Sequence, residues 1–364
     1  MLCVLVKKMS KKLVKRIVAL VTATCAVLAM VSCQGSHKDA PTPKVVLFIG
    51  DGMGLNHVYN GELYYEESMY FSGFETQTLV DTNSLSGTTD SAAAATAMAT
   101  GQRVFNEYVA TNGVTNITSI TELAKKARYG AGVVTSDEIT GATPAGFSAH
   151  ATTRDDEDTI LTTQANSKLD LLLGAGSCTI EQESRFTDNG WKLVTKFDEL
   201  SLKKKPIVSN FMMVVPSDPY NLAPSLTQLA EFSIEYMEKN YSNGYFLMIE
   251  GAKIDKASHS NNIDAMLENL YDFNSAIKLV DEMLKATGDE YTIIVTADHE
   301  TGNLDKAESK LGISNDLYNS TGHTNANVGL YFRSTLDTVP EILNQDLILN
   351  TDIFQLCKYL LALK

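Results

Sequence analysis

The chain has 364 residues, of which 44 are acidic and 30 are basic, and its formal net charge at neutral pH is −14. This acidic balance argues against nucleic-acid binding, which requires a basic surface. It also offers no long-range attraction for anionic ligands, so any phosphate group would have to be held by local side chains.

The N-terminal residues are typical of an export signal. Six basic side chains between 7 and 16 precede an apolar stretch at 17–31. This pattern predicts a secretory signal peptide, and the stretch is too short for a transmembrane helix. Ser32-Cys33 resembles a bacterial lipobox, although Met30 stands where leucine is more usual, and ordinary cleavage nearby is the alternative. We expect a lipoprotein signal peptide at 1–32, a polar linker at 33–43 and one folded domain at 44–364.

Strands and helices alternate along the rest of the chain. Strands are predicted at 44–50, 131–135, 169–173, 245–250, 292–297 and 328–334, and helices at 91–99, 118–127, 226–239, 262–286 and 352–362. The segments WKLVTK (191–196) and PIVSNFMMVV (206–215) are candidates for edge strands. Alternation of this kind predicts a single α/β domain with a largely parallel central sheet flanked by helices.

Asp51 directly follows the apolar strand 44–50 and opens a glycine turn at 51–54. In open α/β sheets, ligands gather at the edge where the parallel strands end. Asp-Gly is also a common turn pair, so the segment alone leaves both interpretations open.

A serine opens the alanine-rich helix predicted at 91–99, and Gly101 is suited to end it. The Ser91 hydroxyl is therefore expected at a helix N-terminus, where free N–H groups and the helix dipole favour an anion. Those are suitable surroundings for a nucleophile that attacks phosphate. An ordinary serine cap, with Asp90 just before it, is the alternative.

More carboxylates and histidines follow other predicted strands. They are Glu250, Asp255, His259, Asp298, His299 and His323. Asp255 and His259 stand four residues apart, which places both on one face of a helical turn. Both are good zinc ligands, and buried carboxylates without a cation or hydrogen-bond partners would be costly. We therefore predict a polynuclear metal site, and the absence of any CxxC pair argues against thiolate ligands.

Six segments, taken in order, resemble the alkaline phosphatase family. They are VVLFIGDGMG, TDSAAAATAMATG, ATPAGFSAHATTR, IEGAKIDKASH, VTADHETGN and TGHT. The resemblance runs from about Lys44 to the C-terminus and implies an alkaline-phosphatase-like fold for the catalytic domain. Only 23 residues separate His299 from His323, too few for the domain that many relatives insert there, so a compact bacterial form is expected.

The resemblance also implies a role for each matching residue. Ser91 matches the nucleophile, Arg154 the arginine that grips the phosphate, and Lys256 a residue that reaches it through water. The implied metals are one zinc on Asp255, His259 and His323, a second zinc on Asp51, Asp298 and His299, and a magnesium on Asp51, Thr143 and Glu250. Gly141 stands where relatives often have Asp or His near the magnesium, so we expect weak magnesium binding.

The implied activity is hydrolysis of small phosphate monoesters through a phosphoserine intermediate, with two Zn²⁺ and one Mg²⁺, by an exported bacterial enzyme. The enzyme would be periplasmic or anchored at the outer membrane, and a lipid on Cys33 would be its only contact with the membrane. The alternatives are a phosphodiesterase or sulfatase of the same superfamily and an inactive phosphate-binding lipoprotein. A homodimer, and pairing of Cys178 with Cys357, are left open.

Overall fold

The computed structural model describes residues 43–175, 180–210 and 224–363. The predicted signal peptide, Cys33, nearly all of the linker and Cys178 lie outside these residues. Within them, no helix combines the length and the apolar character needed to cross a membrane.

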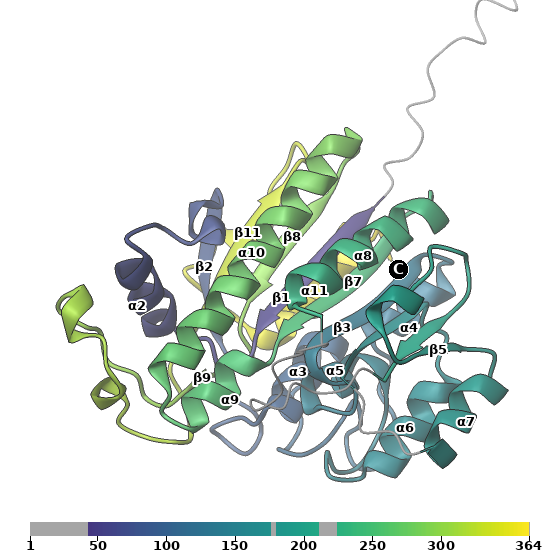
Figure 1. Ribbon diagram of the computed structural model, residues 1–364, viewed down its shortest axis with the longest axis horizontal. Helices are drawn as coiled ribbons and strands as arrows, with labels where there is room; N and C mark the ends of the chain where they lie inside the picture. The colour runs from purple at the N-terminus through teal and green to yellow at the C-terminus, as the bar shows by residue number, and fades with distance from the viewer. Residues whose placement is uncertain (1–42, 176–179, 211–223, 364) are drawn as a thin grey trace, which may run out of the picture. The chain divides into compact units, whose positions relative to one another are not determined.

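A ten-stranded sheet runs through the centre of the domain (Figure 1). From one edge to the other its strands are β12 (Leu347–Leu349), β2 (Thr76–Asp81), β11 (Val328–Ser334), β8 (Thr292–Thr296), β1 (Lys44–Gly50), β7 (Tyr245–Gly251), β3 (Gly130–Glu138), β4 (Leu171–Ala175), β6 (Ile207–Ser209) and β5 (Lys192–Val194). Only β11 runs antiparallel to its neighbours. The predicted largely parallel sheet is confirmed. Both candidate edge segments contain a short strand, but only β5 lies at the edge, because β6 pairs with β4 on one side and β5 on the other; residues 211–215 lie outside the described residues.

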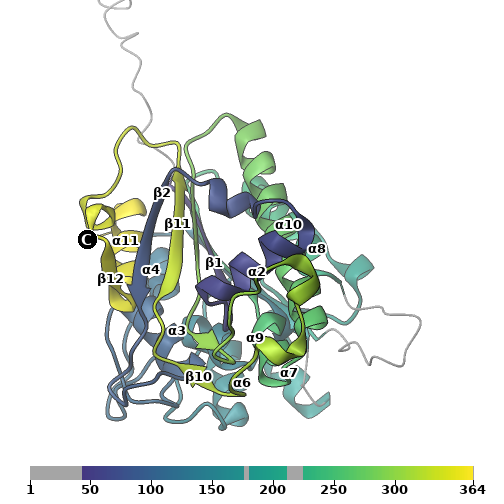
Figure 2. The ribbon, with the colours of Figure 1, turned by 90° about the vertical axis from the view of Figure 1, so that its left-hand side faces the viewer.

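Helices cover both faces of the sheet, as Figure 2 shows with the strands seen nearly edge-on. One face carries α2 (Leu55–Tyr65), α8 (Leu226–Asn240), α9 (Lys253–His259) and α10 (Ile263–Thr287); the other carries α3 (Ser91–Thr100), α4 (Ile120–Lys126), α5 (Ala142–Ser148) and α11 (Asn350–Leu360). Two further helices, α6 (Glu157–Asn166) and α7 (Ile180–Asp188), pack together near β5. A small separate ladder pairs β9 (Glu300–Thr301) with β10 (His323–Thr324). The flanked α/β architecture predicted from the sequence is confirmed.

The central strands are buried on both faces. Every residue of β1, β7 and β8 is buried, and their apolar runs suit parallel strands covered by helices on each side. Phe48 of β1 packs edge-to-face on Phe273 of α10, with ring centroids 5.9 Å apart. This continuous core fixes where the strands end.

Small residues bring α3 and α5 close together. A Cβ atom on Gly146 would lie 2.7 Å from the Cβ of Ala95, so a larger side chain at either position would push the helices apart. Gly101 ends α3 in the left-handed conformation, as predicted, with φ 73°. Because Ser91 begins α3 and Thr143 lies in α5, this packing sets the distance between two predicted site residues.

The strand order explains why distant segments meet. The neighbouring parallel strands β8, β1, β7 and β3 end at the same edge, so the residues that follow them converge there. Since β11 is antiparallel to β8, it begins at that edge, and His323 in the segment just before it is brought to the same place.

Candidate active site

Ser91 is the first residue of α3, and its hydroxyl does not cap the helix. The cap is Asp90, whose Oδ1 accepts a hydrogen bond from the Ala93 N–H at 2.9 Å. The serine-cap alternative is therefore wrong, because the neighbouring carboxylate fills that position. The buried Ser91 Oγ instead lies 3.2 Å from Nε2 of His299.

Three ligand-type atoms, one of them the His299 nitrogen beside that hydroxyl, lie close together. Nε2 of His299 lies 3.2 Å from Oδ2 of Asp298 and 3.5 Å from Oδ1 of Asp51. Ligands of a tetrahedral zinc, each about 2.0–2.2 Å from the ion, stand roughly 3.3 Å apart. The spacing of Asp51, Asp298 and His299 therefore fits one cation, with Ser91 Oγ beside it.

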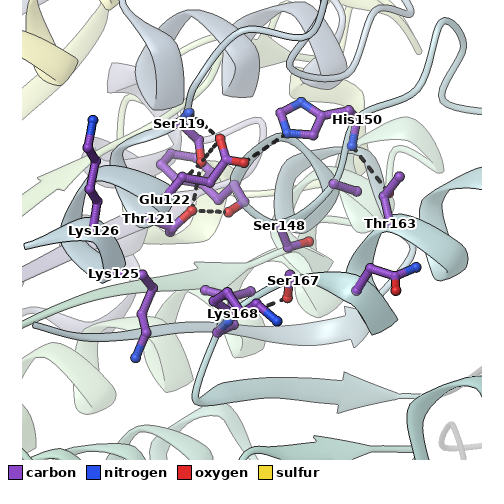
Figure 3. A pocket seen from close by; sticks show the side chains of 14 residues that line it. Ser119, Thr121, Glu122, Lys125, Lys126, Ser148, His150, Thr163, Ser167 and Lys168 are labelled. Carbon is purple, nitrogen blue, oxygen red and sulfur yellow. Dashed lines mark hydrogen bonds and ion pairs between the residues drawn. The ribbon is translucent and has the colours of Figure 1, made fainter. Parts of the chain in front are cut away.

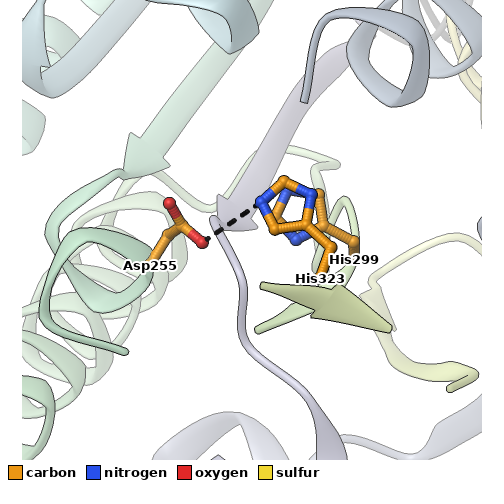
Figure 4. Close-up of side chains that lie close together, drawn as sticks. All are labelled: Asp255, His299 and His323. Carbon is orange, nitrogen blue, oxygen red and sulfur yellow. Dashed lines mark ion pairs between the residues drawn. The ribbon is translucent and has the colours of Figure 1, made fainter. Parts of the chain in front are cut away.

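Asp255, His259 and His323 form a second group next to the first. Nε2 of His259 lies 3.2 Å from Asp255 Oδ2 and 3.1 Å from Nε2 of His323, which is 3.8 Å from Asp255 Oδ1. Figure 4 shows the rings of His299 and His323 stacked, with centroids 3.5 Å apart, and Asp255 facing them. The two groups are thus adjacent, as a pair of neighbouring cations would require.

All three histidines present Nε2 toward this centre because Nδ1 is bound elsewhere. The Nδ1 partners are the Thr321 carbonyl for His259 (2.5 Å), the Thr89 carbonyl for His323 (2.9 Å) and the Thr301 hydroxyl for His299 (3.2 Å). Hydrogen bonds of this kind fix ring orientation and tautomer in metal-binding histidines.

An oxygen-only group adjoins the histidines. The Thr143 hydroxyl donates to Asp51 Oδ2 at 3.5 Å, and both residues interact with the Glu250 carboxylate. The Thr135 hydroxyl also donates to Glu250. Carboxylate and hydroxyl oxygens suit a hard cation such as magnesium.

Burial disfavours the charged form of three carboxylates in these groups, whereas the hydrogen bond from His259 lowers the pKa of Asp255 despite its burial. Burial raises the pKa of Glu250 to about 7 and that of Asp298 to about 8, and burial with neighbouring Asp298 raises the pKa of Asp51 well above its usual value. Asp51 Oδ1 and Asp298 Oδ2 have no hydrogen-bond partner. Buried, unpartnered carboxylate oxygens beside imidazole nitrogens fit metal ions.

A cavity of 430 Å³ opens beside Ser91 and is lined by Arg154, Lys256 and Asp137, among others. Nη1 of Arg154 lies 3.3 Å from Asp90 Oδ2, so the carboxylate that caps α3 also holds the guanidinium near the hydroxyl. Lys256 forms an ion pair with Asp137. The predicted phosphate-binding residues therefore flank the predicted nucleophile.

Every predicted site residue except Cys33, which lies outside the described residues, reaches this edge of the sheet. Sequence reasoning missed the roles of Asp90, Asp137 and Thr301. The Thr301 hydroxyl contacts Asp255 and the ring of His299, and thereby connects the two histidine groups. The only feature of the sequence that could have indicated this role of Thr301 is its position two residues after His299.

A second cavity of 560 Å³ lies apart from this chemistry, between α4, the end of α5 and α6 (Figure 3). There Glu122 and His150 lie 3.2 Å apart, and His150 Nδ1 is bound to the Ala110 carbonyl. Because its histidine and carboxylate are paired with each other, this cavity presents no ligand cluster comparable to the one at Ser91.

The sequence was also compared with protein families and with curated proteins. A family profile described as alkaline phosphatase matches residues 43–191 and 186–339. The chain is 30% identical to an alkaline phosphatase of Schizosaccharomyces pombe, over 74% of this chain and 58% of that protein, and 31% identical to alkaline phosphatase 3 of Bacillus subtilis, over 71% and 61%. It thus spans about three-fifths of the length of these curated relatives.

Solved structures show a similar fold. The alkaline phosphatase of the Antarctic bacterium TAB5 superposes with a TM-score of 0.74 at 25% identity, covering 89% of this chain and 99% of that one. The Thermus thermophilus alkaline phosphatase gives a TM-score of 0.75 at 17% identity, covering 90% and 92%.

Proposed function

The chain belongs to the alkaline phosphatase family, and on that premise we propose that it hydrolyses phosphate monoesters with Ser91 as the nucleophile. The proposal rests on one observation. At the N-terminus of α3, Ser91 Oγ lies beside His299, whose Nε2 is close to carboxylate oxygens of Asp51 and Asp298. A free serine hydroxyl is a weak nucleophile at neutral pH, and a neighbouring cation is one way to activate it.

The proposed cation sites follow the three groups of donors. One zinc is assigned to Asp255, His259 and His323, a second to Asp51, Asp298 and His299, and a magnesium to Asp51, Thr143 and Glu250. When bound, the zinc ions would supply positive charge at the attacking and leaving oxygens of the phosphoryl group.

The protein side chains would carry the remaining steps. Ser91 Oγ forms a bond to phosphorus while the bond to the ester oxygen breaks, which releases the alcohol and leaves a phosphoserine. Water then attacks this phosphoserine and releases inorganic phosphate. Arg154 presents a planar fork to two phosphate oxygens, and the free N–H groups of α3 favour the same negative charge.

The ester class is the first test of the proposal. A phosphate monoester leaves enough free oxygens for both Arg154 and the cations, whereas a diester or sulfate ester offers fewer or less charged ones. We expect kcat/KM for p-nitrophenyl phosphate to exceed that for the corresponding diester and sulfate by at least about a hundredfold, which corresponds to roughly 2.7 kcal/mol. Comparable turnover of the diester would favour the phosphodiesterase alternative, and no turnover of any ester would favour an inactive binding protein.

We also propose export and lipidation at Cys33, on the strength of the Ser32-Cys33 pattern after an apolar stretch. Cys33→Ser is expected to move the protein from the membrane fraction to the soluble fraction with unchanged kinetics, because buried acyl chains contribute about 0.8 kcal/mol per CH₂. Cys25→Ser, inside the apolar stretch, is the matched control and should leave the protein in the membrane fraction. Recovery of the unmutated protein only in the soluble fraction would refute the lipid anchor.

A further inference from the structure

Asp137 lies near the end of β3 and is not among the residues assigned to a cation or to the phosphate. Its side chain is only 8% exposed and lines the same cavity as Ser91, Arg154 and Glu250. One carboxylate oxygen pairs with Lys256, while the other, Oδ1, is buried without a hydrogen-bond partner. A buried carboxylate oxygen without a partner is costly, so its position calls for a ligand.

The sheet fixes Asp137 relative to the oxygen-only group. Thr135 pairs with Glu250 in the register of β3 against β7, and its hydroxyl donates to the Glu250 carboxylate. The same hydroxyl accepts a hydrogen bond from the Asp137 N–H at 3.1 Å. Two consecutive hydrogen bonds therefore connect the Asp137 backbone to Glu250.

Gly141 lines the same cavity and contributes no side chain to it. It precedes α5 with φ −51° and ψ 152°, a conformation open to any residue. The sequence led us to expect weak magnesium binding for this reason, but that expectation considered position 141 alone. The carboxylate absent at position 141 is supplied to the same cavity by position 137.

We propose that Asp137 takes the place of a carboxylate at position 141. Its unpartnered oxygen accepts hydrogen bonds from the water shell of the divalent cation assigned to Asp51, Thr143 and Glu250, and its other oxygen holds Lys256 at the cavity. Asp137 is thus a positioning residue for both the hydrated cation and the lysine. This inference rests on the proposed function, and it replaces the expectation of weak magnesium binding.

The chemistry of magnesium supports this assignment. Magnesium loses its waters reluctantly and is held by a few protein oxygens while several waters remain. Those waters donate hydrogen bonds and require acceptors, which a buried carboxylate oxygen supplies. Outer residues of this kind change metal affinity by roughly 10–100-fold when they are removed.

The test is direct magnesium binding by calorimetry to the zinc-loaded protein. Asp137→Asn keeps the size of the side chain and removes its charge, and we expect magnesium to bind at least about tenfold more weakly. Asp155→Asn is the matched control, because Asp155 lines the same cavity but is exposed to solvent. Its magnesium affinity should stay within about twofold of the unmutated value.

A second pair of variants removes the carboxylate at position 137 and returns one at position 141. Asp137→Ala should weaken magnesium binding, and adding Gly141→Asp to it should recover most of the loss. A Cβ at position 141 would lie 3.0 Å from the Glu138 carbonyl, so a shift of a few tenths of an ångström suffices.

Unchanged magnesium affinity in Asp137→Asn, or an equal loss in Asp155→Asn, would overturn the inference. So would a double variant that binds magnesium no better than Asp137→Ala. If the unmutated protein hydrolyses phosphomonoesters but binds no magnesium, the inference fails while the proposed function stands.

Discussion

Removal of metal ions with a chelator is expected to reduce phosphomonoester hydrolysis by at least about a thousandfold, and added zinc should restore it. The ligand atoms around Ser91 Oγ are an imidazole nitrogen and two carboxylate oxygens, which release zinc to a strong chelator. Without cations, the hydroxyl loses the positive charge that would stabilise its deprotonated form, and ionised carboxylates repel the phosphate. Full activity in protein shown by elemental analysis to be metal-free would contradict this account.

Metal removal should also change how the stability of the fold depends on pH. Burial raises the pKa of Glu250 from 4.5 to about 7 and that of Asp298 from 3.8 to about 8. Between the ordinary and the raised pKa of each group, Glu250 and Asp298 bind more protons in the folded metal-free protein than in the unfolded chain. Their contribution to the free energy of unfolding therefore falls as the pH rises. Each unit of pKa difference corresponds to about 1.4 kcal/mol, and the loss should be complete above about pH 8.

Urea denaturation at several pH values measures this effect. The metal-free protein should have a clearly lower midpoint at pH 9 than at pH 7, because in this range the buried His57 and His299, whose pKa values burial lowers, are largely neutral in the folded and unfolded states alike. The zinc-loaded protein should be stabilised most at the higher pH. A metal-free midpoint that stays constant or rises over this range would show that these carboxylates do not carry unbalanced charge.

Ser91→Ala is expected to lower kcat by about three orders of magnitude while zinc binding stays intact. The variant loses the covalent route, but Arg154 and the cations still stabilise negative charge on the phosphoryl group, so slow direct attack by water should persist. Ser275→Ala is the matched control, because that serine is half-buried on α10 and its hydroxyl donates to the Tyr271 carbonyl rather than to a residue of the site. It should leave kcat unchanged.

Zinc content separates the chemical role of Ser91 from a structural one. If Ser91→Ala retains both zinc ions and its melting temperature but loses turnover, the hydroxyl acts in the reaction. Turnover at the unmutated rate with zinc retained would exclude Ser91 as the nucleophile.

Much of this site could be predicted from the sequence because its ligands follow recognisable strands. Asp51 comes directly after the buried strand β1, and Asp298 and His299 come just after β8. Neighbouring parallel strands end at one edge, so local patterns predicted a shared metal site, and the family resemblance implied how its ligands are grouped. The alanine-rich start of α3 likewise placed Ser91 at a helix N-terminus, although the sequence left open which residue caps it.

The parts that could not be predicted depend on contacts between distant segments. His323 was predicted as a ligand, but nothing local indicates that β11 runs antiparallel, which is how the fold brings His323 to the site. Asp137 stands in an unremarkable segment, and its place in the cavity is set by the register of β3 against β7. The sequence suggested for Asp90 no more than a place beside the start of a helix. In the structure one oxygen of Asp90 caps α3 and the other accepts a hydrogen bond from Arg154.

Trapping the phosphoserine intermediate shows whether Ser91 is phosphorylated during turnover. The zinc-loaded protein is incubated with inorganic phosphate at acidic pH, quenched, digested and mapped by mass spectrometry. Phosphate is expected on Ser91, and none in Ser91→Ala or after chelation. Phosphate on a different residue, or no phosphorylated peptide from a preparation that hydrolyses phosphomonoesters at full rate, would contradict it.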